Sequence, residues 1–432
     1  MAYKKNVAII GAGYVGLTLA IYMADRGSNV IVIENDKKKL KKLKQGKSPI
    51  YEVGLNTVFK KCFKSKKLTF SEGSDAYSDN WIIAISYFPG DVKKYIDVLK
   101  YIKTENNKPP TVMIRGTVPV GYTRKFLIPA LKKIFKGNLD EKFYLTTAPE
   151  RTLSGDALNE LEDLPQLVGG TDVSVNRCSK VYNKVGIDCI ELESLESGEL
   201  AKTFTNFARL VQFNLSNYLG SLCINYQIND QAIFNALKEG YPRLNFLSEI
   251  GPGVGGFCLP KDSLVLHDAF KEINSAFPKK LSVYPEQQFY LNKNIINYHI
   301  NIVKSFLKKS DNILAIGIAF KGKPQTDDTR DSTGLAIVKS LLKNKYKISV
   351  YDRTVSKIDQ KKLKLITPHS LSKSKYSALL ILNNDDNYKK YLKKNIFKFK
   401  KKIKIYDPWR IIVKTESLFI QDSFVTENFS NF

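Results

Sequence analysis

The stretch that most constrains the fold lies at residues 7–34 and reads VAIIGAGYVGLTLAIYMADRGSNVIVIE. A short apolar run ends in the pattern Gly-x-Gly-x-x-Gly, an apolar helical pattern follows, and a second apolar run at 30–33 is closed by an acid. In this order the features indicate a strand–helix–strand unit that binds a dinucleotide. A purely structural glycine loop is the alternative, and the full context favours the binding function.

Each glycine of this loop has a physical task. Gly11 makes the tight turn, Gly13 lets a pyrophosphate approach the backbone, and Gly16 allows the helix to pack closely on the strand. The helix N-terminus attracts the phosphate charge. Glu34, 18 residues past the last glycine, would accept hydrogen bonds from ribose hydroxyls and repel a 2′-phosphate. The pattern predicts NAD rather than NADP as the cofactor, bound by Gly11, Gly13, Tyr14, Val15, Gly16 and Glu34.

Three further apolar runs, at 81–87, 111–115 and 143–148, alternate with helical patterns in the first part of the chain. This alternation is typical of a doubly wound parallel sheet, which binds ligands beyond the carboxyl ends of its strands. Thr117 and Glu150 stand just beyond two of these runs, so we expect both near a ligand. Taken alone, each residue also fits a turn or a cap, because Thr and Glu beside Pro and Gly often serve there.

A second glycine-rich stretch, GPGVGGFCLPKD at 251–262, surrounds Cys258 with four glycines. Glycines let a ligand approach the backbone closely. Asp262 lies four residues past the thiol in a stretch with a helical pattern, so we expect it one turn away on the same helix face. The alternative is a glycine loop with an inert cysteine, because a buried thiol behaves as a small hydrophobic group.

Residues 196–237 carry a long helical pattern in which Lys202 and Asn206 stand four apart, on one helix face. Arg209 lies about one turn further on. A lysine and an amide side by side in an otherwise apolar helix suit the stabilisation of a developing oxyanion. The alternative is a lysine that extends to solvent and an amide that caps backbone groups.

The overall composition argues against several classes of protein. With 432 residues the chain is too long for one hydrophobic core, so two or three domains are expected. Its five cysteines are scattered without a CxxC pair, which argues against a disulfide framework and a zinc site, and no metal is expected. No apolar run is long enough to span a bilayer, and the first ten residues do not resemble a signal peptide. We therefore expect a cytoplasmic protein without membrane insertion.

The formal net charge of +26 is the unusual bulk property. It predicts either binding to nucleic acid or a membrane surface, or simply a lysine-rich surface. The lysines are spread along the chain without a zinc finger, an RNP motif or a recognition-helix pattern, which favours the last interpretation and no nucleic-acid partner. A non-catalytic NAD-binding protein that associates with nucleic acid is the remote alternative. A basic surface would also attract polyanionic small substrates such as nucleotides.

Taken together, the motifs closely resemble the UDP-glucose/GDP-mannose dehydrogenase family of nucleotide-sugar 6-dehydrogenases. The resemblance covers essentially the whole chain and is specific because many segments occur in the family's order. These segments are VAIIGAGYVGLTLA (7–20), RGTVPVGYT (115–123), APERTLSGDALNELEDLPQLVGG (148–170), ELAKTFTN (199–206), GYPRLN (240–245), GPGVGGFCLPKD (251–262), GIAFKGKPQTDDTRDS (317–332) and IYDPW (405–409).

The resemblance implies an α/β fold with two Rossmann-like doubly wound domains, joined by a central helical domain whose long helix makes a dimer contact. We expect an N-terminal NAD-binding domain at 1–195, the helical dimerisation domain at 196–305, and a C-terminal nucleotide-sugar-binding domain at 306–432. The expected partners are a UDP-sugar substrate and further copies of the chain, in a homodimer or a higher homo-oligomer.

The family oxidises a C6 hydroxyl to a carboxylate in two NAD-dependent steps without a metal, so the resemblance implies covalent catalysis by Cys258. Its thiolate would add to the aldehyde formed first, and oxidation of the thiohemiacetal would give a thioester that water hydrolyses. Lys202 and Asn206 match positions that stabilise charge on the reacting oxygen, and Lys202 is also a candidate proton acceptor. The implied catalytic residues are Cys258, Lys202, Asn206, Asp262, Glu150 and Thr117, the last three handling water and protons.

Two further sets of residues follow from the resemblance. Cations in them would face sugar and diphosphate oxygens of the ligands. The implied substrate-binding residues are Glu150, Arg151, Lys202, Asn206, Arg209, Arg243, Gly255 and Lys321. The residues that the resemblance adds to the cofactor site are Thr117, Lys321 and Arg330.

Two positions depart from the family pattern. Many members carry a second glutamate where this chain has Ser154, and Gly116 stands where a serine is commoner. The Pro-Glu-Arg sequence at 149–151, with LPQLVGG downstream, resembles the branch that acts on UDP-N-acetylhexosamines. We therefore expect oxidation of UDP-N-acetylmannosamine or UDP-N-acetylglucosamine for surface polysaccharide biosynthesis, with UDP-glucose as the alternative substrate.

Overall fold

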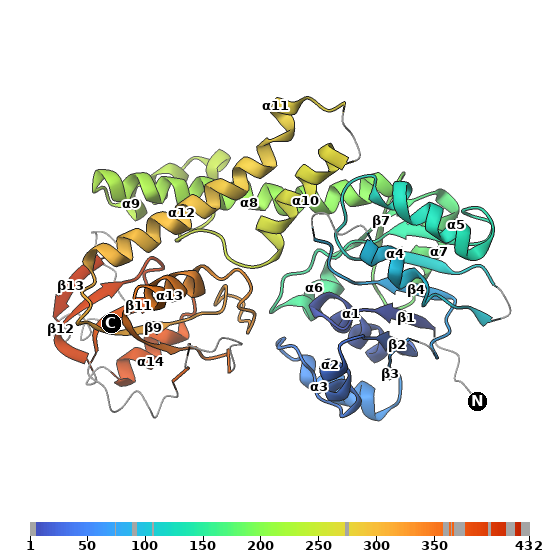
Figure 1. Cartoon of the computed structure of the whole chain (residues 1–432), viewed down its shortest axis with the longest axis horizontal. Helices are drawn as coiled ribbons and strands as arrows, with labels where there is room; N and C mark the ends of the chain where they lie inside the picture. Colours follow the sequence, from blue (N-terminus) through green and yellow to red (C-terminus); the bar gives the residue numbers. More distant parts are fainter. Residues whose placement is uncertain are drawn as a thin grey trace. The chain divides into compact units, whose positions relative to one another are not determined.

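The computed structural model describes residues 6–73, 75–88, 93–105, 108–272, 276–356, 363, 365–366, 376–395, 399–411 and 420–424 (Figure 1). The chain forms two compact units. The first contains residues 1–206 and 261–285, and the second contains residues 207–260 and 286–432. Three helices contribute residues to both units, so this division leaves the boundaries expected at 195 and 305 as predictions. The three helices are α8 (Leu195–Tyr226), α10 (Cys258–Glu272) and α12 (Tyr284–Phe306).

The first unit is built on an eight-stranded sheet with the strand order β3-β2-β1-β4-β5-β6-β7-β8. Neighbouring strands pair in parallel, except that β6 and β7 are antiparallel. The doubly wound α/β prediction is confirmed, with one antiparallel pairing that the sequence pattern did not indicate. The strands are β1 (Val7–Ile10), β2 (Val30–Ile33), β3 (Leu68–Ser71), β4 (Asn80–Ile83), β5 (Thr111–Ile114), β6 (Tyr144–Thr147), β7 (Gln166–Gly170) and β8 (Cys189–Leu192).

Both faces of this sheet are buried, which explains why its strands read as continuous apolar runs. Along β1, Val7 and Ile9 belong to one hydrophobic cluster, while Ala8 and Ile10 belong to another. Helices cover both faces and connect successive strands. They are α1 (Tyr14–Asp25), α2 (Lys37–Lys44), α3 (Leu55–Lys64), α4 (Lys93–Leu99), α5 (Ile128–Phe135), α6 (Ala157–Asp163) and α7 (Asp172–Asn183), with a π-helical turn at Thr123–Leu127 before α5 and the short α11 (Lys279–Ser282) later in the chain.

The second unit contains a five-stranded sheet with the strand order β10-β9-β11-β12-β13. The first four strands pair in parallel, and β13 pairs with β12 in the antiparallel direction. This confirms the second α/β unit that the sequence predicts. Its elements are α9 (Asp230–Lys238), a 3-10 turn at Pro242–Leu244, β9 (Asn312–Ile316), α13 (Thr333–Lys343), β10 (Lys347–Tyr351), β11 (Tyr376–Ile381), α14 (Asn387–Asn395), β12 (Phe399–Tyr406) and β13 (Ile420–Phe424).

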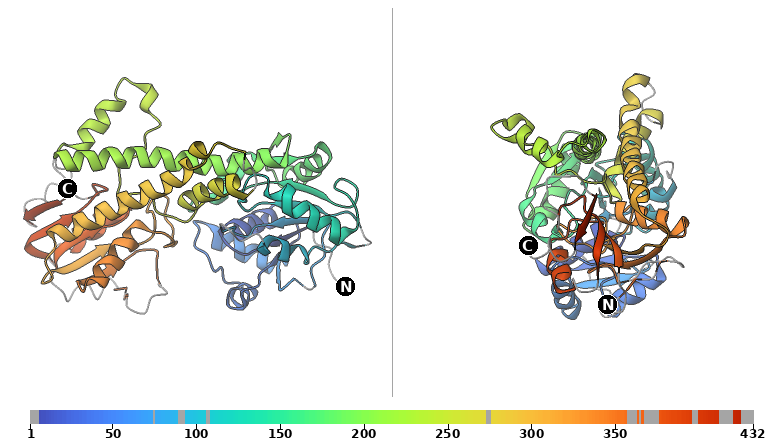
Figure 2. Two further views of the ribbon diagram at one scale, coloured as in Figure 1. Left: turned by 45° about the horizontal axis from the view of Figure 1, so that its top comes forward. Right: turned by 90° about the vertical axis from the view of Figure 1, so that its left-hand side faces the viewer.

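The long helix expected at 196–237 is two helices rather than one. Helix α8, green in Figure 2, is continuous to Tyr226, and α9 begins at Asp230. Between them Gln227 has a φ of 56°, a left-handed conformation that ends the first helix. Asn229 then caps α9 by accepting a hydrogen bond from the backbone N–H of Ala232 at 3.0 Å.

Hydropathy along the helices bears on the expected absence of a membrane span. Within the described part of the chain, no helix is both long and apolar enough to cross a bilayer.

Candidate active site

The turn between β1 and α1 has the geometry of a dinucleotide-binding loop. Gly11 has a φ of +105°, and a Cβ there would lie 2.6 Å from the carbonyl oxygen of Ala84. A Cβ on Gly16 would lie 2.0 Å from the carbonyl oxygen of Gly11, so only glycine allows α1 to approach β1 this closely. A Cβ on Gly13 would instead meet open space. The loop thus presents bare backbone at the N-terminus of a helix, which fits a pyrophosphate.

The acid that closes β2 lies against this loop. Glu34 is 6% exposed, and its carboxylate accepts hydrogen bonds from the backbone N–H groups of Ala12, at 3.2 Å, and Asp36, at 2.9 Å. These bonds fix the carboxylate beside the glycine turn, where an adenosine ribose lies in folds of this kind. Tyr14 and Val15 are the first residues of α1. The predicted dinucleotide-binding residues therefore fit NAD as a group.

Two predicted catalytic residues from distant parts of the chain, Thr117 and Asn206, contact a third, Asp262. This carboxylate is 1% exposed, and its Oδ2 accepts hydrogen bonds from Asn206 Nδ2 at 2.5 Å and from Thr117 Oγ1 at 3.5 Å. The second distance is at the long limit of a hydrogen bond. Lys261 forms an ion pair with the other carboxylate oxygen. The loop after β5, helix α8 and helix α10 thus converge on one buried carboxylate.

Glu150, just beyond β6, is held by an arginine that the sequence reasoning did not single out. Arg115, at the end of β5, is 1% exposed and forms an ion pair with Glu150. It also donates to Gln166 Oε1 at 2.6 Å. Burial alone would raise the pKa of Glu150, but the charge of Arg115, hydrogen bonds from Thr152 and the charge of Lys202 outweigh it and lower that pKa. Glu150 is therefore an ionised carboxylate within the electrostatic reach of Lys202.

Cys258 belongs to the second unit and is the first residue of α10, the helix that carries Asp262 one turn later. Of the five cysteines, all of which the structure describes, it is the exposed one. Burial raises the pKa of Cys62 and of Cys189 to about 11, so both are protonated at neutral pH. A thiol at a helix N-terminus is, by contrast, placed where the helix favours negative charge.

The glycines before Cys258 pack against the loop that follows β9. Gly256 has a φ of +90°, and a Cβ there would lie 2.7 Å from the ring of Phe320. Its N–H donates to the carbonyl oxygen of Asp331 at 3.3 Å. A Cβ on Gly255 would lie 3.2 Å from the backbone nitrogen of Thr333. These positions require glycine for close packing within the second unit, besides any approach of a substrate.

The predicted cations of the second unit lie at several places within it. Arg330 forms an ion pair with Asp328 at 2.7 Å. Its guanidinium lies 4.8 Å from the ring centre of Phe257, the residue that precedes Cys258 in the sequence. Lys321 lies 5.5 Å from the ring centre of Phe320. Arg243 lies in the 3-10 turn, and Arg209 lies on α8.

Arg151, in the first unit, donates to the carbonyl oxygen of Pro165 at 2.6 Å, so its guanidinium is partly engaged by the backbone. Arg209, Arg243, Gly255, Lys321 and Arg330 all belong to the second unit. The structure therefore brings together Thr117, Asn206 and Asp262, with Lys202 near Glu150. A single site that also contains Cys258 and these cations stays a prediction.

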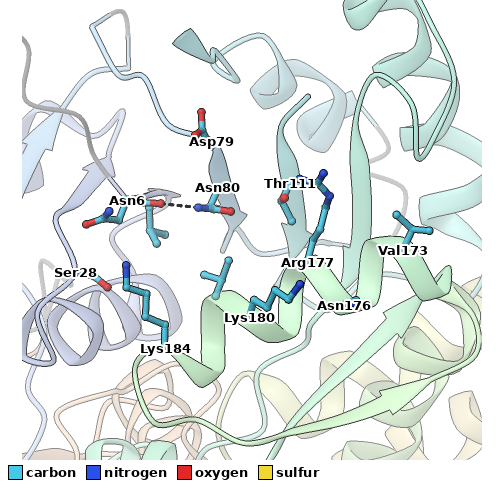
Figure 3. Close-up of a pocket in the computed structure, with 12 residues that line it drawn as sticks. Asn6, Ser28, Asp79, Asn80, Thr111, Val173, Asn176, Arg177, Lys180 and Lys184 are labelled. Atoms are coloured by element: carbon cyan, nitrogen blue, oxygen red, sulfur yellow. Dashed lines mark hydrogen bonds between the residues drawn. The ribbon is translucent and has the colours of Figure 1, made fainter. Parts of the chain in front are cut away.

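A separate cavity of about 680 Å³ lies in the first unit, at the amino ends of β1, β4 and β5 (Figure 3). Arg177, Lys180 and Lys184 of α7 line it, together with Asn6 and Asn80, whose Nδ2 donates to the Asn6 carbonyl oxygen at 2.8 Å. The predicted site residues are not among its lining residues, and doubly wound sheets bind their ligands at the opposite, carboxyl edge. This cavity does not define the candidate active site.

Among the residues that the structure describes, no group of three His, Cys, Asp or Glu side chains is arranged to hold a metal ion. The parallel sheet, the glycine loop and Glu34 define the class of this protein as an NAD-binding oxidoreductase of the doubly wound dinucleotide fold.

Comparison with known proteins identifies the family. Residues 5–186 match the NAD binding domain of the UDP-glucose/GDP-mannose dehydrogenase family, residues 196–282 its central domain, and residues 314–414 its UDP binding domain. The chain belongs to the UDP-glucose/GDP-mannose dehydrogenase family and is an NAD-dependent nucleotide-sugar dehydrogenase. The family, the cofactor and the enzyme class expected from the sequence are confirmed.

Individual relatives are similar over nearly their whole length. A UDP-N-acetyl-D-mannosamine dehydrogenase of Methanococcus vannielii is 25% identical, with 96% of this chain and 93% of the relative covered. A UDP-N-acetyl-D-glucosamine 6-dehydrogenase of Salmonella typhi is 26% identical, with 94% and 96% covered. The native structure of the UDP-N-acetyl-mannosamine dehydrogenase Cap5O from Staphylococcus aureus superimposes with a TM-score of 0.78 at 25% identity, covering 96% of this chain and 97% of that one.

Proposed function

We propose that this enzyme oxidises the C6 hydroxyl of a UDP-N-acetylhexosamine, with UDP-N-acetylmannosamine as the first candidate, to the uronic acid. The observation that supports this most directly is the convergence of Thr117 and Asn206 on Asp262, in the helix that begins with the exposed Cys258. The relatives named for N-acetylmannosamine and N-acetylglucosamine support an acetamido sugar. In the overall reaction one hydroxymethyl group, two NAD⁺ and one water give one carboxylate, two NADH and three protons.

The first oxidation needs a proton acceptor and a stabiliser of negative charge on the C6 oxygen. Lys202 of α8, as a neutral amine, accepts the proton of the C6 hydroxyl and becomes an ammonium. Asn206 donates an amide N–H to the C6 oxygen, and Asp262 orients this amide by accepting its other N–H group. The ionised Glu150 attracts the Lys202 ammonium and so holds it in place. NAD, when bound at the Gly11–Gly16 loop, supplies the electron acceptor for this step and for the second oxidation.

Cys258 then retains the aldehyde. Its thiolate attacks the aldehyde carbon, a carbon–sulfur bond forms, and the carbonyl oxygen takes up a proton to give a thiohemiacetal. Oxidation of this hemiacetal gives a thioester. The exposure of Cys258 and its place at the N-terminus of α10 suit a nucleophile, and Asn206 and Lys202 again offer donors to the oxygen.

Water completes the reaction by attacking the thioester carbon, which breaks the carbon–sulfur bond and releases the thiolate and the carboxylate product. Thr117, Glu150 and Asp262 are the polar groups available to orient this water and take its proton. Glu150 suits the role because its lowered pKa keeps it ionised and Arg115 fixes its position.

The proposal extends to the assembly and the setting of the enzyme. Large apolar side chains on α8 are exposed, as expected for a helix that contacts a second copy of the chain in a homodimer or higher oligomer. We place the reaction in the cytoplasm and its product in surface polysaccharide synthesis. Light scattering of the Leu215→Glu/Leu222→Glu variant tests the contact, and an unchanged mass would exclude it. The exposed side chains are Leu200, Phe204, Leu215, Tyr218, Leu222 and Tyr226.

The substrate is tested by comparing kcat/KM for UDP-N-acetylmannosamine, UDP-N-acetylglucosamine and UDP-glucose. A site that hydrogen-bonds the acetamido group discriminates strongly against a sugar that lacks it. We expect kcat/KM for UDP-glucose to be lower by about 100-fold or more. A higher value for UDP-glucose would establish the alternative substrate.

Family membership argues against a non-catalytic protein, and filter binding of DNA and RNA at physiological salt tests the remaining nucleic-acid prediction.

A further inference from the structure

Glu199 is a buried carboxylate that ties α8 to a distant loop. It is 3% exposed and lies in the second turn of α8. Its Oε2 accepts a hydrogen bond from the backbone N–H of Gly121 at 2.6 Å, and its Oε1 accepts one from the N–H of Thr123 at 2.8 Å. These N–H groups lie at the start of the helical segment that leads into α5, where the first N–H groups lack partners within the helix.

The two ends of this tie both carry predicted catalytic residues. The loop that Glu199 holds begins at Thr117, which contacts Asp262. On α8, Lys202 and Asn206 lie three and seven residues after Glu199, a spacing that places all three on one helix face. The position of the loop relative to this face decides how far Thr117 lies from Asp262 and Asn206.

We propose that Glu199 is a positioning residue that holds Thr117 at the catalytic face of α8 and thereby sets the rate of thioester hydrolysis. This inference rests on the proposed function, in which Thr117 orients the hydrolytic water. The Thr117–Asp262 distance of 3.5 Å is at the limit of a hydrogen bond, so a small loop movement breaks it. A buried carboxyl group whose two oxygens each accept a backbone N–H is well suited to prevent such a movement.

A second tie between the same elements provides a matched control. Glu196, one turn earlier on α8, forms an ion pair with Arg124 of the same segment, with a bond of 3.1 Å between Oε2 and a guanidinium nitrogen. This pair is partly exposed, and exposed pairs contribute little. If the two links between α8 and the loop were equivalent, Glu196→Gln and Glu199→Gln would change the rate of thioester hydrolysis by the same factor. If the buried carboxylate is required, only Glu199→Gln has an effect.

The test measures NADH formation by the wild type, Glu199→Gln and Glu196→Gln in stopped flow with UDP-N-acetylmannosamine and saturating NAD. Glutamine keeps one acceptor oxygen but turns an N–H₂ group toward the other backbone N–H. We expect Glu199→Gln to retain a burst of two NADH per active site, followed by steady-state turnover about tenfold slower than wild type. Intact-protein mass spectrometry should then find the thioester accumulated on Cys258. Glu196→Gln should match the wild type.

A double-mutant comparison separates positioning from a general structural role. If Glu199 acts through Thr117, the variant Glu199→Gln/Thr117→Ala should be no slower than Thr117→Ala alone. The inference would be overturned if the losses of turnover rate in the two single variants added up in the double variant. It would also be overturned if Glu199→Gln turned over at the wild-type rate, or if its NADH burst fell in proportion to its steady-state rate. If Glu199→Gln does not fold, Glu199→Asp is judged by the same criteria. A wild type that forms no NADH with any UDP-sugar would refute the proposed function instead.

Discussion

At the scale of single residues, the environment of each cysteine separates Cys258 from the others. Cys62, Cys178 and Cys223 are buried, and Cys189 is half-buried. Burial raises the pKa of each of these four thiols. The proposed nucleophile Cys258, by contrast, is exposed at the start of α10, which is the environment that a reactive thiol needs.

Replacing Cys258 should separate binding from catalysis. We expect Cys258→Ala to abolish uronate formation while the affinity for NAD, measured by fluorescence titration, changes less than about twofold, because the glycine loop is untouched. Cys189→Ala is the control and should retain activity. Uronate formation by Cys258→Ala at the wild-type rate would remove covalent catalysis from the mechanism.

Glu199 should also make stability depend on pH. Burial raises its pKa to about 8 in the folded chain, against an ordinary value of 4.5. Hydrogen bonds from Thr123 and Gly121 oppose this rise, and the charge of Glu196 adds to it. Between about pH 4.5 and 8 the folded chain retains a proton that the unfolded chain releases, so the contribution of Glu199 to stability is greatest at low pH and falls as pH rises toward 8. The slope due to this residue reaches at most about 1.4 kcal/mol per pH unit.

Urea unfolding at pH 5, 6.5 and 8 checks this dependence. The difference in unfolding free energy between wild type and Glu199→Gln should shift in favour of the variant as pH rises, because glutamine carries no charge to bury. If the difference in unfolding free energy between wild type and Glu199→Gln stays constant across the three pH values, Glu199 keeps an ordinary pKa.

The contacts of Arg115 with Glu150 and of Glu199 with the Gly121 loop could not be predicted from the sequence, whereas Thr117, Asn206 and Asp262 were expected in one site and lie together. An arginine after an apolar run and a glutamate early in a helix are common and have no local signature. Their roles come from partners far along the chain, 35 residues away for Arg115 and Glu150 and 78 for Glu199 and Gly121. The one local feature of Arg115 is a charge that directly follows a buried strand, and this feature does not indicate its partner.

At the scale of elements, the β1–α1 junction distinguishes two uses of glycine. Gly16 lets the helix approach the strand, while Gly13 leaves open space for a ligand. We expect Gly16→Ala to lower the unfolding free energy by about 2 kcal/mol or more, because its Cβ would collide with backbone. Gly13→Ala should leave stability unchanged and weaken NAD binding about tenfold or more, because its Cβ would occupy ligand space.

Chemical denaturation and NAD titration of both variants, side by side, check this contrast. Gly13→Ala that binds NAD like the wild type would contradict the assignment of the loop, and so would Gly16→Ala with unchanged stability.

Sequence patterns located most elements but not all of their ends. The strands expected at 111–115 and 143–148 agree with β5 and β6 to within one residue at each end. The break between α8 and α9 was missed because the helical pattern continues across it. The chain reverses at Gln227 in a left-handed conformation that sequences usually mark with glycine.

At the scale of the whole molecule, strand and helix patterns predicted the first α/β unit, and the family resemblance implied the second. The sequence patterns did not predict the antiparallel pairing of β7 with β6, nor the edge strand β13. Strand direction depends on long-range pairing, and a short apolar run has the same pattern in either direction. The net charge of +26 comes from lysines that are spread along the chain, which fits a lysine-rich surface.

The proposed function requires that one active site take a nucleotide sugar through two successive oxidations, with the sugar carbon bound to Cys258 as a thioester before hydrolysis. The most direct measurement supplies a limiting, known amount of UDP-N-acetylmannosamine with excess NAD and counts the NADH formed at completion. We expect two NADH per sugar, with no aldehyde released to a trapping amine. One NADH per sugar with trapped aldehyde would contradict the proposed function.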